Sequence, residues 1–154
     1  MDLSDLVKPQ GVLSGVKAGS KKQLLQVLSE KAAEITGLPE RDIFETVLQR
    51  ERLGSTGTGN GIAIPHGKLK NAKSITGIFA RLEKPVDFEA FDDEPVDIVF
   101  LLLAPEHAGA DHLKALSRIA RILRDPDMVS KLRATPDAAA LYSFLTVVPT
   151  SNAA

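Results

Sequence analysis

Cysteine is absent from this sequence of 154 residues, and neither sign of charge dominates it. Without cysteine the chain cannot form disulfides, iron–sulfur clusters or zinc ribbons, and thiol catalysis is excluded. The 19 Lys and Arg residues oppose 20 Asp and Glu residues, so the formal net charge is -1. This balance excludes a strongly basic nucleic-acid surface and a polybasic membrane anchor.

Long hydrophobic runs are missing as well. The longest apolar segment is the seven residues 98–104, whereas about twenty are needed to cross a bilayer. The first six residues, Met-Asp-Leu-Ser-Asp-Leu, are acidic where a secretory signal would be basic. We therefore expect a cytoplasmic protein without a membrane segment.

The composition is that of an ordinary globular domain, with 44% hydrophobic and 25% charged residues. No internal repeat or linker is visible, so we predict one domain over residues 1–154. Its core covers about residues 4–147, and residues 148–154 form a frayed tail. Helical and strand patterns are mixed along the chain, which predicts an α/β fold with a small sheet packed by helices.

Apolar periodicity and capping residues predict five helices, at residues 20–37, 39–54, 111–125, 126–133 and 136–145. Ser20 and Gln23 have the spacing of a capping box, and Pro39 suits a first turn. Asp111 and Thr135 are the predicted caps of the third and last helices. The predicted core stripe of the third helix consists of Leu113, Leu116, Ala120 and Leu123.

Strands are predicted at residues 12–16, 62–64, 74–82 and 96–103. The first reads as a short edge strand, and the last is apolar enough to lie in the middle of a sheet. The acidic segment 87–95 reads as a solvated turn, to which we assign no function.

The most informative segment is R-E-R-L-G-S-T-G-T-G-N-G-I-A-I-P-H-G-K at residues 50–68. Its glycines allow backbone N–H groups to turn toward a common point, which suits an anion. The spacing fits neither a Walker A loop nor the dinucleotide fingerprint, so no nucleotide is predicted. The candidate phosphate-binding residues are Gly57, Gly59, Asn60 and Gly61.

The three histidines are His66, His107 and His112. Together they have the right chemistry for zinc, but they match no helical metal motif, and we predict no metal. For His107 we expect a surface or structural role, and residue type alone favours a water-facing position for His112. His66, which lies between Pro65 and Gly67 at the end of a predicted strand, is the candidate nucleophile.

A neutral imidazole, with its pKa near 6.5, can attack a phosphoryl group without activation. Arg50 could bind the phosphoryl oxygens in a bidentate manner, and His112 could add a contact at a helix N-terminus. Residue type and position alone favour a simpler role for Arg50, that of an ordinary cation at a helix end. A phosphocarrier and a non-enzymatic anion-binding module therefore remain equal alternatives at this point.

Residues 50–68 resemble the active-site segment of enzyme IIA proteins of the mannitol/fructose type, and most closely those of the nitrogen-regulatory branch. These are phosphocarriers of the bacterial phosphoenolpyruvate-dependent phosphotransferase system. The resemblance covers essentially the whole chain, including P-V-D-I-V-F-L-L-L-A-P at 95–105 and D-H-L-K-A-L-S at 111–117. One departure is Thr58, a loop position where the family commonly has isoleucine.

The resemblance implies a mixed sheet of about five strands with helices on both faces. It implies that His66 accepts a phosphoryl group from a phosphohistidine carrier protein (HPr-like), with Arg50 and His112 as active-site residues. No metal, nucleotide or other cofactor is implied.

Nitrogen-regulatory relatives bind regulatory target proteins according to their phosphorylation state, whereas sugar-specific relatives pass phosphate to an enzyme IIB domain. We expect the former, a phosphocarrier and regulatory protein. The alternatives are a sugar-specific enzyme IIA and the anion-binding module.

Overall fold

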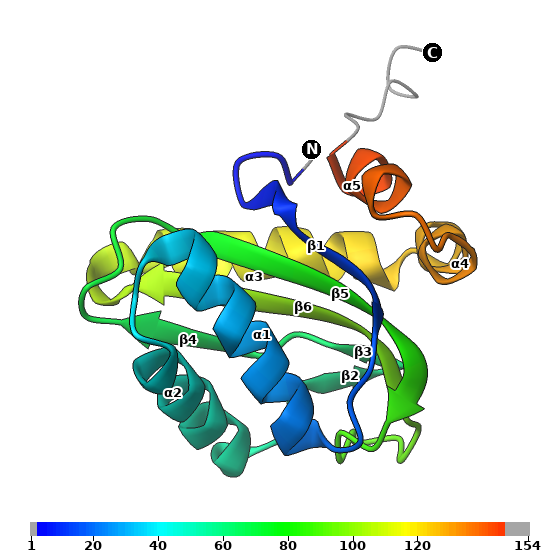
Figure 1. Ribbon diagram of the computed structural model, residues 1–154, viewed down its shortest axis with the longest axis horizontal. Coiled ribbons are helices and arrows are strands. Elements are labelled where there is room, and N and C mark those ends of the chain that lie inside the picture. Colours follow the sequence, from blue (N-terminus) through cyan, green and yellow to red (C-terminus); the bar gives the residue numbers. More distant parts are fainter. Residues whose placement is uncertain (1–2, 147–154) are drawn as a thin grey trace.

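The structure, a computed structural model, describes residues 3–146 and is built around one β-sheet with helices on both faces (Figure 1). The strands are β1 (Val7–Val16), β2 (Gly57–Gly59), β3 (Ile62–Ala63), β4 (His66–Leu69), β5 (Thr76–Val86) and β6 (Val96–Pro105). The helices are α1 (Lys21–Thr36), α2 (Glu40–Leu53), the 3-10 turn η1 (Glu106–Ala108), α3 (Ala110–Arg124), α4 (Pro126–Ala134) and α5 (Ala138–Thr146). The predicted tail at 148–154 lies outside the described residues.

The sheet has the order β1-β5-β6-β3-β2, and β4 pairs with β6 beyond the end of β3. β5 runs antiparallel to β6, while β3 and β4 both run parallel to it. β1 lies at the edge and runs parallel to β5. This mixed sheet confirms the predicted α/β class, with six strands in place of about five.

The central strand β6 divides the hydrophobic core into two clusters, because its side chains alternate between the two faces of the sheet. The cluster under α1 and α2 takes Val99, Leu101 and Leu103. The cluster under α3, α4 and α5 takes Ile98, Phe100 and Leu102. The predicted mid-sheet strand is thus confirmed.

The first two helices begin and end close to the predicted residues. Ser20 caps α1 by accepting a hydrogen bond from Gln23 N–H at 3.1 Å, and Gly37 ends it with a left-handed φ of 77°. The Gln23 side chain bonds the residue before the cap, so the capping box is not closed. Pro39 is the N-cap of α2 rather than a first-turn residue, and Gly54 ends the helix.

Three strands, β1, β5 and β6, are longer than predicted. β1 begins at Val7 although it contains Pro9, because an edge strand tolerates a residue without an N–H. A register shift between Val7 and Val12 absorbs the irregularity. β5 continues to Val86, where it pairs with Val96.

Helix α3 presents a different face to the core than predicted. Gly109 is its N-cap, so Asp111 lies in the first turn and not at the cap. The predicted stripe is wrong at Leu113, which is 66% exposed. The prediction takes His112 as a polar, exposed residue. Because its side chain is buried, most of the core-facing positions of α3 lie one residue earlier than predicted. The residues that are buried are His112, Ala115, Ile119 and Leu123.

Helix α5 begins after Asp137, whose carboxylate accepts a hydrogen bond from Ala140 N–H at 3.0 Å. The predicted cap, Thr135, instead ends α4. Both residue types are good caps, so the sequence alone does not separate them.

The beginning of the described chain lies beside α5 (Figure 1). Leu3 N–H donates to the Leu145 carbonyl at 3.1 Å, and both side chains belong to the cluster under α3, α4 and α5. The Arg118 guanidinium of α3 bonds Asp5 at 2.6 Å and lowers the pKa of that carboxyl. These contacts join the first residues of the chain to its last helices.

Candidate active site

His66 is the first residue of β4, where it lies opposite Leu102 of β6. It is therefore carried by a strand and not by a loop, and its side chain is half-buried. Its Nδ1 lies 2.9 Å from the Ile64 carbonyl oxygen. Because a carbonyl only accepts hydrogen bonds, Nδ1 carries the proton of the neutral ring and Nε2 keeps its lone pair. Nε2 is thus the nucleophilic nitrogen.

His112 lies edge-on to His66, with 5.6 Å between the ring centroids and 63° between the ring planes. It is only 5% exposed, contrary to the water-facing position that residue type favours. Burial lowers the pKa of His112, and the charges of His66 and Lys68 lower it further. Its Nδ1 is buried and has no hydrogen-bond partner within residues 3–146, which leaves Nε2 as the nitrogen available to an external group.

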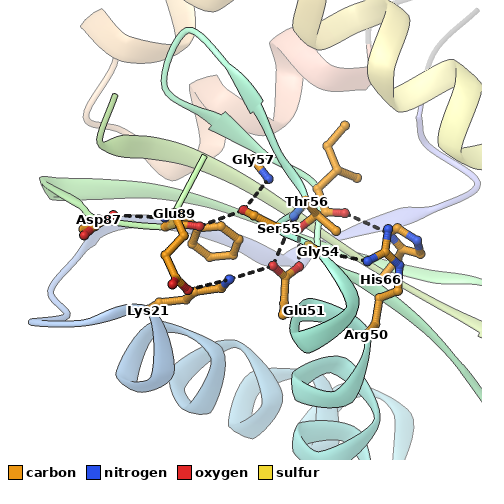
Figure 2. A network of polar contacts seen from close by, with 12 residues as sticks. Lys21, Arg50, Glu51, Gly54, Ser55, Thr56, Gly57, His66, Asp87 and Glu89 are labelled. Carbon is orange, nitrogen blue, oxygen red and sulfur yellow. Dashed lines mark hydrogen bonds and ion pairs between the residues drawn. The ribbon is translucent and has the colours of Figure 1, made fainter. Parts of the chain in front are cut away.

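Arg50 reaches the site from the last turn of α2. A Cβ added to Gly67 would lie 2.8 Å from Thr46 Cγ2, so glycine allows α2 and β4 to lie close together. Arg50 follows Thr46 by one helical turn, and Figure 2 shows its guanidinium pointing toward the His66 ring. Its Nη1 donates to the Gly54 carbonyl at 2.9 Å.

The candidate phosphate-binding glycines are not brought to His66, because they form a β-hairpin. Gly59 pairs with Ile62, so Asn60 and Gly61 are the two turn residues, with φ of 56° and 80°. Positive φ at both positions defines the Asn-Gly hairpin turn. This dipeptide is the signal in the sequence that predicts a turn in place of an anion cradle.

The N–H groups and the position of this hairpin support the correction. Asn60 N–H donates to Asp92 at 3.0 Å, and Gly57 N–H donates to Ser55 Oγ at 3.1 Å. Along β6, Ile62 lies opposite Ile98 while His66 lies opposite Leu102. Four residues of strand separate these positions by ~13 Å.

Glu51, beside Arg50 in α2, is a polar residue for which the sequence alone predicts no role. It is 5% exposed and lies on the buried stripe of α2 that Ile43 and Val47 begin. Its carboxylate accepts hydrogen bonds from the N–H and the hydroxyl of Thr56. The i, i+4, i+8 spacing with two apolar residues could have identified it as buried.

Two large apolar side chains next to site residues are exposed. Leu53, three residues after Arg50, is 85% exposed, and Leu113, which follows His112, is 66% exposed. A third, Phe91 at 79%, lies beside Gly59 at the hairpin.

Within residues 3–146, no three His, Cys, Asp or Glu side chains are grouped so that they could hold a metal ion. Over the same residues, no helix is both long and apolar enough to cross a membrane.

The chain is similar to known proteins in both sequence and structure. Residues 5–147 match the family described as "Phosphoenolpyruvate-dependent sugar phosphotransferase system, EIIA 2". A nitrogen regulatory protein of Bradyrhizobium diazoefficiens is 60% identical over 153 residues, which are 99% of this chain and 100% of the relative.

Two further relatives extend the comparison. The crystal structure of nitrogen regulatory protein IIA-Ntr from Neisseria meningitidis superposes with a TM-score of 0.88 at 35% identity, covering 92% of this chain and 97% of the other. A fructose-specific EIIA component of Haloferax volcanii is 34% identical over 136 residues, or 86% of this chain and 88% of the relative.

Proposed function

This chain belongs to the EIIA 2 family of the phosphoenolpyruvate-dependent sugar phosphotransferase system, and from that premise we propose that it is a phosphocarrier that accepts a phosphoryl group on His66. The observation that carries the proposal is the fixed His66 ring. Its Nδ1–H is held by the Ile64 carbonyl at 2.9 Å, and the His112 ring lies 5.6 Å away. Nε2 therefore carries no proton and keeps its lone pair free for attack.

The transfer step uses this lone pair. Nε2 of His66 attacks the phosphorus of a phosphohistidine on the donor, a phosphohistidine carrier protein (HPr-like). A new N–P bond forms while the donor N–P bond breaks, and the donor imidazole keeps the bonding electron pair. Arg50 and neutral His112 supply hydrogen-bond donors for the phosphoryl oxygens, whose charge spreads in the transition state. No step requires a metal or a nucleotide.

The phosphorylation state then controls binding to regulatory target proteins. A phosphoryl group adds about two negative charges at pH 7 near His112 and Lys68, and the exposed side chains Leu53 and Leu113 lie close in sequence to the site residues Arg50 and His112. A partner that docks there meets a different surface charge in each state. The 60% identity over nearly the whole chain to a nitrogen regulatory protein supports this regulatory role. We place the reaction in the cytoplasm.

The test is labelling of the purified chain by phosphoenolpyruvate together with the general phosphotransferase proteins. We expect an acid-labile phosphoryl group on the wild-type chain and none on His66→Ala. His107→Ala is the matched control, because this histidine lies exposed in η1, and it should label fully. Full labelling of His66→Ala contradicts the proposal.

A sugar-specific role is the second candidate, supported by the 34% identity to a fructose-specific EIIA component. Rapid transfer of phosphate from the labelled chain to an enzyme IIB domain, with turnover of a sugar, would favour it over regulation. The third candidate, a non-enzymatic anion-binding module, requires an anion that binds reversibly while no covalent phosphate forms. It is weakened because the N–H groups of Gly57 and Asn60 are already bonded within the protein.

A further inference from the structure

The buried carboxylate of Glu51, next to Arg50 in α2, takes no part in the transfer step described above. The Glu51 side chain is 1% exposed and lies 3.0 Å from Lys21 Nζ. Thr56 donates to it twice, through its N–H at 3.1 Å and through its hydroxyl (Figure 2). A charge at this depth costs several kcal/mol of desolvation, which an apolar residue on the same stripe would avoid.

From Thr56, hydrogen bonds continue to the reacting ring. The Thr56 carbonyl accepts from Ile64 N–H at 3.0 Å. The Ile64 carbonyl in turn accepts from Nδ1 of His66 at 2.9 Å. Ile64, whose carbonyl keeps the His66 proton on Nδ1, is therefore one hydrogen bond from Thr56 and two from Glu51.

The segment that Glu51 holds through Thr56 also includes the carbonyl that binds Arg50. Glu51 follows Arg50 in the last turn of α2, and Arg50 donates to the Gly54 carbonyl at 2.9 Å. Gly54 lies two residues before Thr56, so the short segment between them is fixed to the helix end at both of its ends. Lys21, from the first turn of α1, balances the charge and lies 4.6 Å from the Phe88 ring centroid.

We propose that Glu51, acting through Thr56, is a positioning residue for phosphoryl transfer: it fixes the Ile64 carbonyl that orients His66 and the Gly54 carbonyl that orients Arg50. The inference rests on the proposed function of His66. Without the carboxylate, the Ile64 carbonyl no longer holds Nδ1–H, and the tautomer protonated at Nε2 becomes populated. That tautomer has no lone pair at Nε2 and cannot attack phosphorus.

The first test measures the His66 tautomer without any phosphoryl donor. ¹⁵N NMR of the histidine rings above pH 8 should give the Nδ1–H form for the wild-type chain and a substantial Nε2–H fraction for Glu51→Gln. Thr56→Ser keeps both donors and should match the wild type. Asp97→Asn is the matched control, because it breaks a 3.0 Å ion pair with Arg133 at the far end of β3.

The second test measures the rate at which phosphoramidate, a small donor that needs no docking, phosphorylates His66. Glu51→Gln should react about 10-fold more slowly than the wild type, as expected when orientation of a catalytic group is lost, while Asp97→Asn keeps the wild-type rate. Thermal unfolding of each variant establishes that the chains compared are folded.

Three results would overturn the positioning role. They are wild-type ring shifts and rate in folded Glu51→Gln, the same loss in Asp97→Asn, and a mixed tautomer in the wild-type chain. A wild-type chain that is never phosphorylated would instead refute the proposed function, and the tautomer comparison would still decide whether Glu51 orients the ring.

Discussion

At the scale of single residues, the burial of His112 links the chemistry of the site to the stability of the fold. Burial is the largest cause of its lowered pKa, followed by the charges of His66 and Lys68. The ring is therefore neutral at pH 7. It can donate one hydrogen bond without adding a positive charge beside Lys68. The same burial makes protonation of His112 unfavourable for the folded state.

His112→Gln should reduce the loss of stability on acidification. In the wild type, the unfolded chain protonates His112 at the ordinary pKa of 6.5, whereas the folded chain protonates it only at lower pH. The unfolded state thus binds more protons between these two values, and the free energy of unfolding falls as the pH drops below about 6.5. Urea denaturation near pH 7.5 and pH 5.5 measures this difference. His107→Gln should keep the wild-type pH dependence; an equal dependence in His112→Gln would contradict the prediction.

Single residues of the site were predictable where a motif surrounds them and unpredictable where tertiary contacts decide. His66, Arg50 and His112 are the candidates that the motif predicts, and the His112 ring lies 5.6 Å from the His66 ring. The burial of His112 was missed, because a histidine next to Leu113 reads as the polar side of a helix. The burial of Glu51 is not predictable from its neighbours, because a carboxylate between two arginines usually lies in solvent.

At the scale of elements, the contact between α2 and β4 sets the distance from Arg50 to His66. Gly67→Ala places a methyl group 2.8 Å from Thr46 Cγ2, so the helix must move away from the strand. We expect a loss of about 1–3 kcal/mol in stability, as for overpacking in cores, together with slower phosphorylation of His66.

Thr46→Ser removes the methyl group that Gly67→Ala meets, so the double variant should recover most of both losses. Denaturation and phosphoramidate labelling of the two single variants and the double variant form the cycle. Additive effects would show that this contact does not set the position of Arg50.

Because the β2–β3 hairpin lies away from His66, substitutions in its turn should change stability without changing phosphorylation of His66. Gly61→Ala requires φ of 80° and places a methyl group against Arg133 and Asp97, which should cost about 1–3 kcal/mol. Asn60→Gly keeps a turn that glycine adopts readily and should be nearly neutral. Both folded variants should label at His66 like the wild type. Loss of labelling in folded Asn60→Gly would contradict this separation and support phosphate binding by the glycine-rich loop.

The elements themselves followed from the sequence where local signals are strong. Ser20 and Gly37 mark the ends of α1 by capping chemistry that needs no tertiary partner. Strand ends were less predictable, because the extension of β5 to Val86 depends on pairing with Val96. The strand predicted at 62–64 is confirmed as β3, whereas β2 and β4 depend on pairing with β3 and β6, which no local pattern records.

At the scale of the whole molecule, exposed apolar residues next to the site separate docking from chemistry. Leu53→Glu and Leu113→Glu, made together, should raise the KM for the phosphohistidine carrier protein by about tenfold, because a buried apolar contact of this size contributes 1–3 kcal/mol. The rate with phosphoramidate should not change. Phe91→Glu, at 79% exposure near the hairpin, is the matched control. An equal effect of Phe91→Glu on KM would refute docking at Leu53 and Leu113.

The hydrogen bond between Leu3 and Leu145 has a consequence for synthesis of the protein. The start of β1 is synthesised well before α5, which carries Leu141 and Leu145 of the same core cluster. Until α5 has left the ribosome, that apolar start lacks its cover. Completion of this corner of the core therefore waits for synthesis of α5.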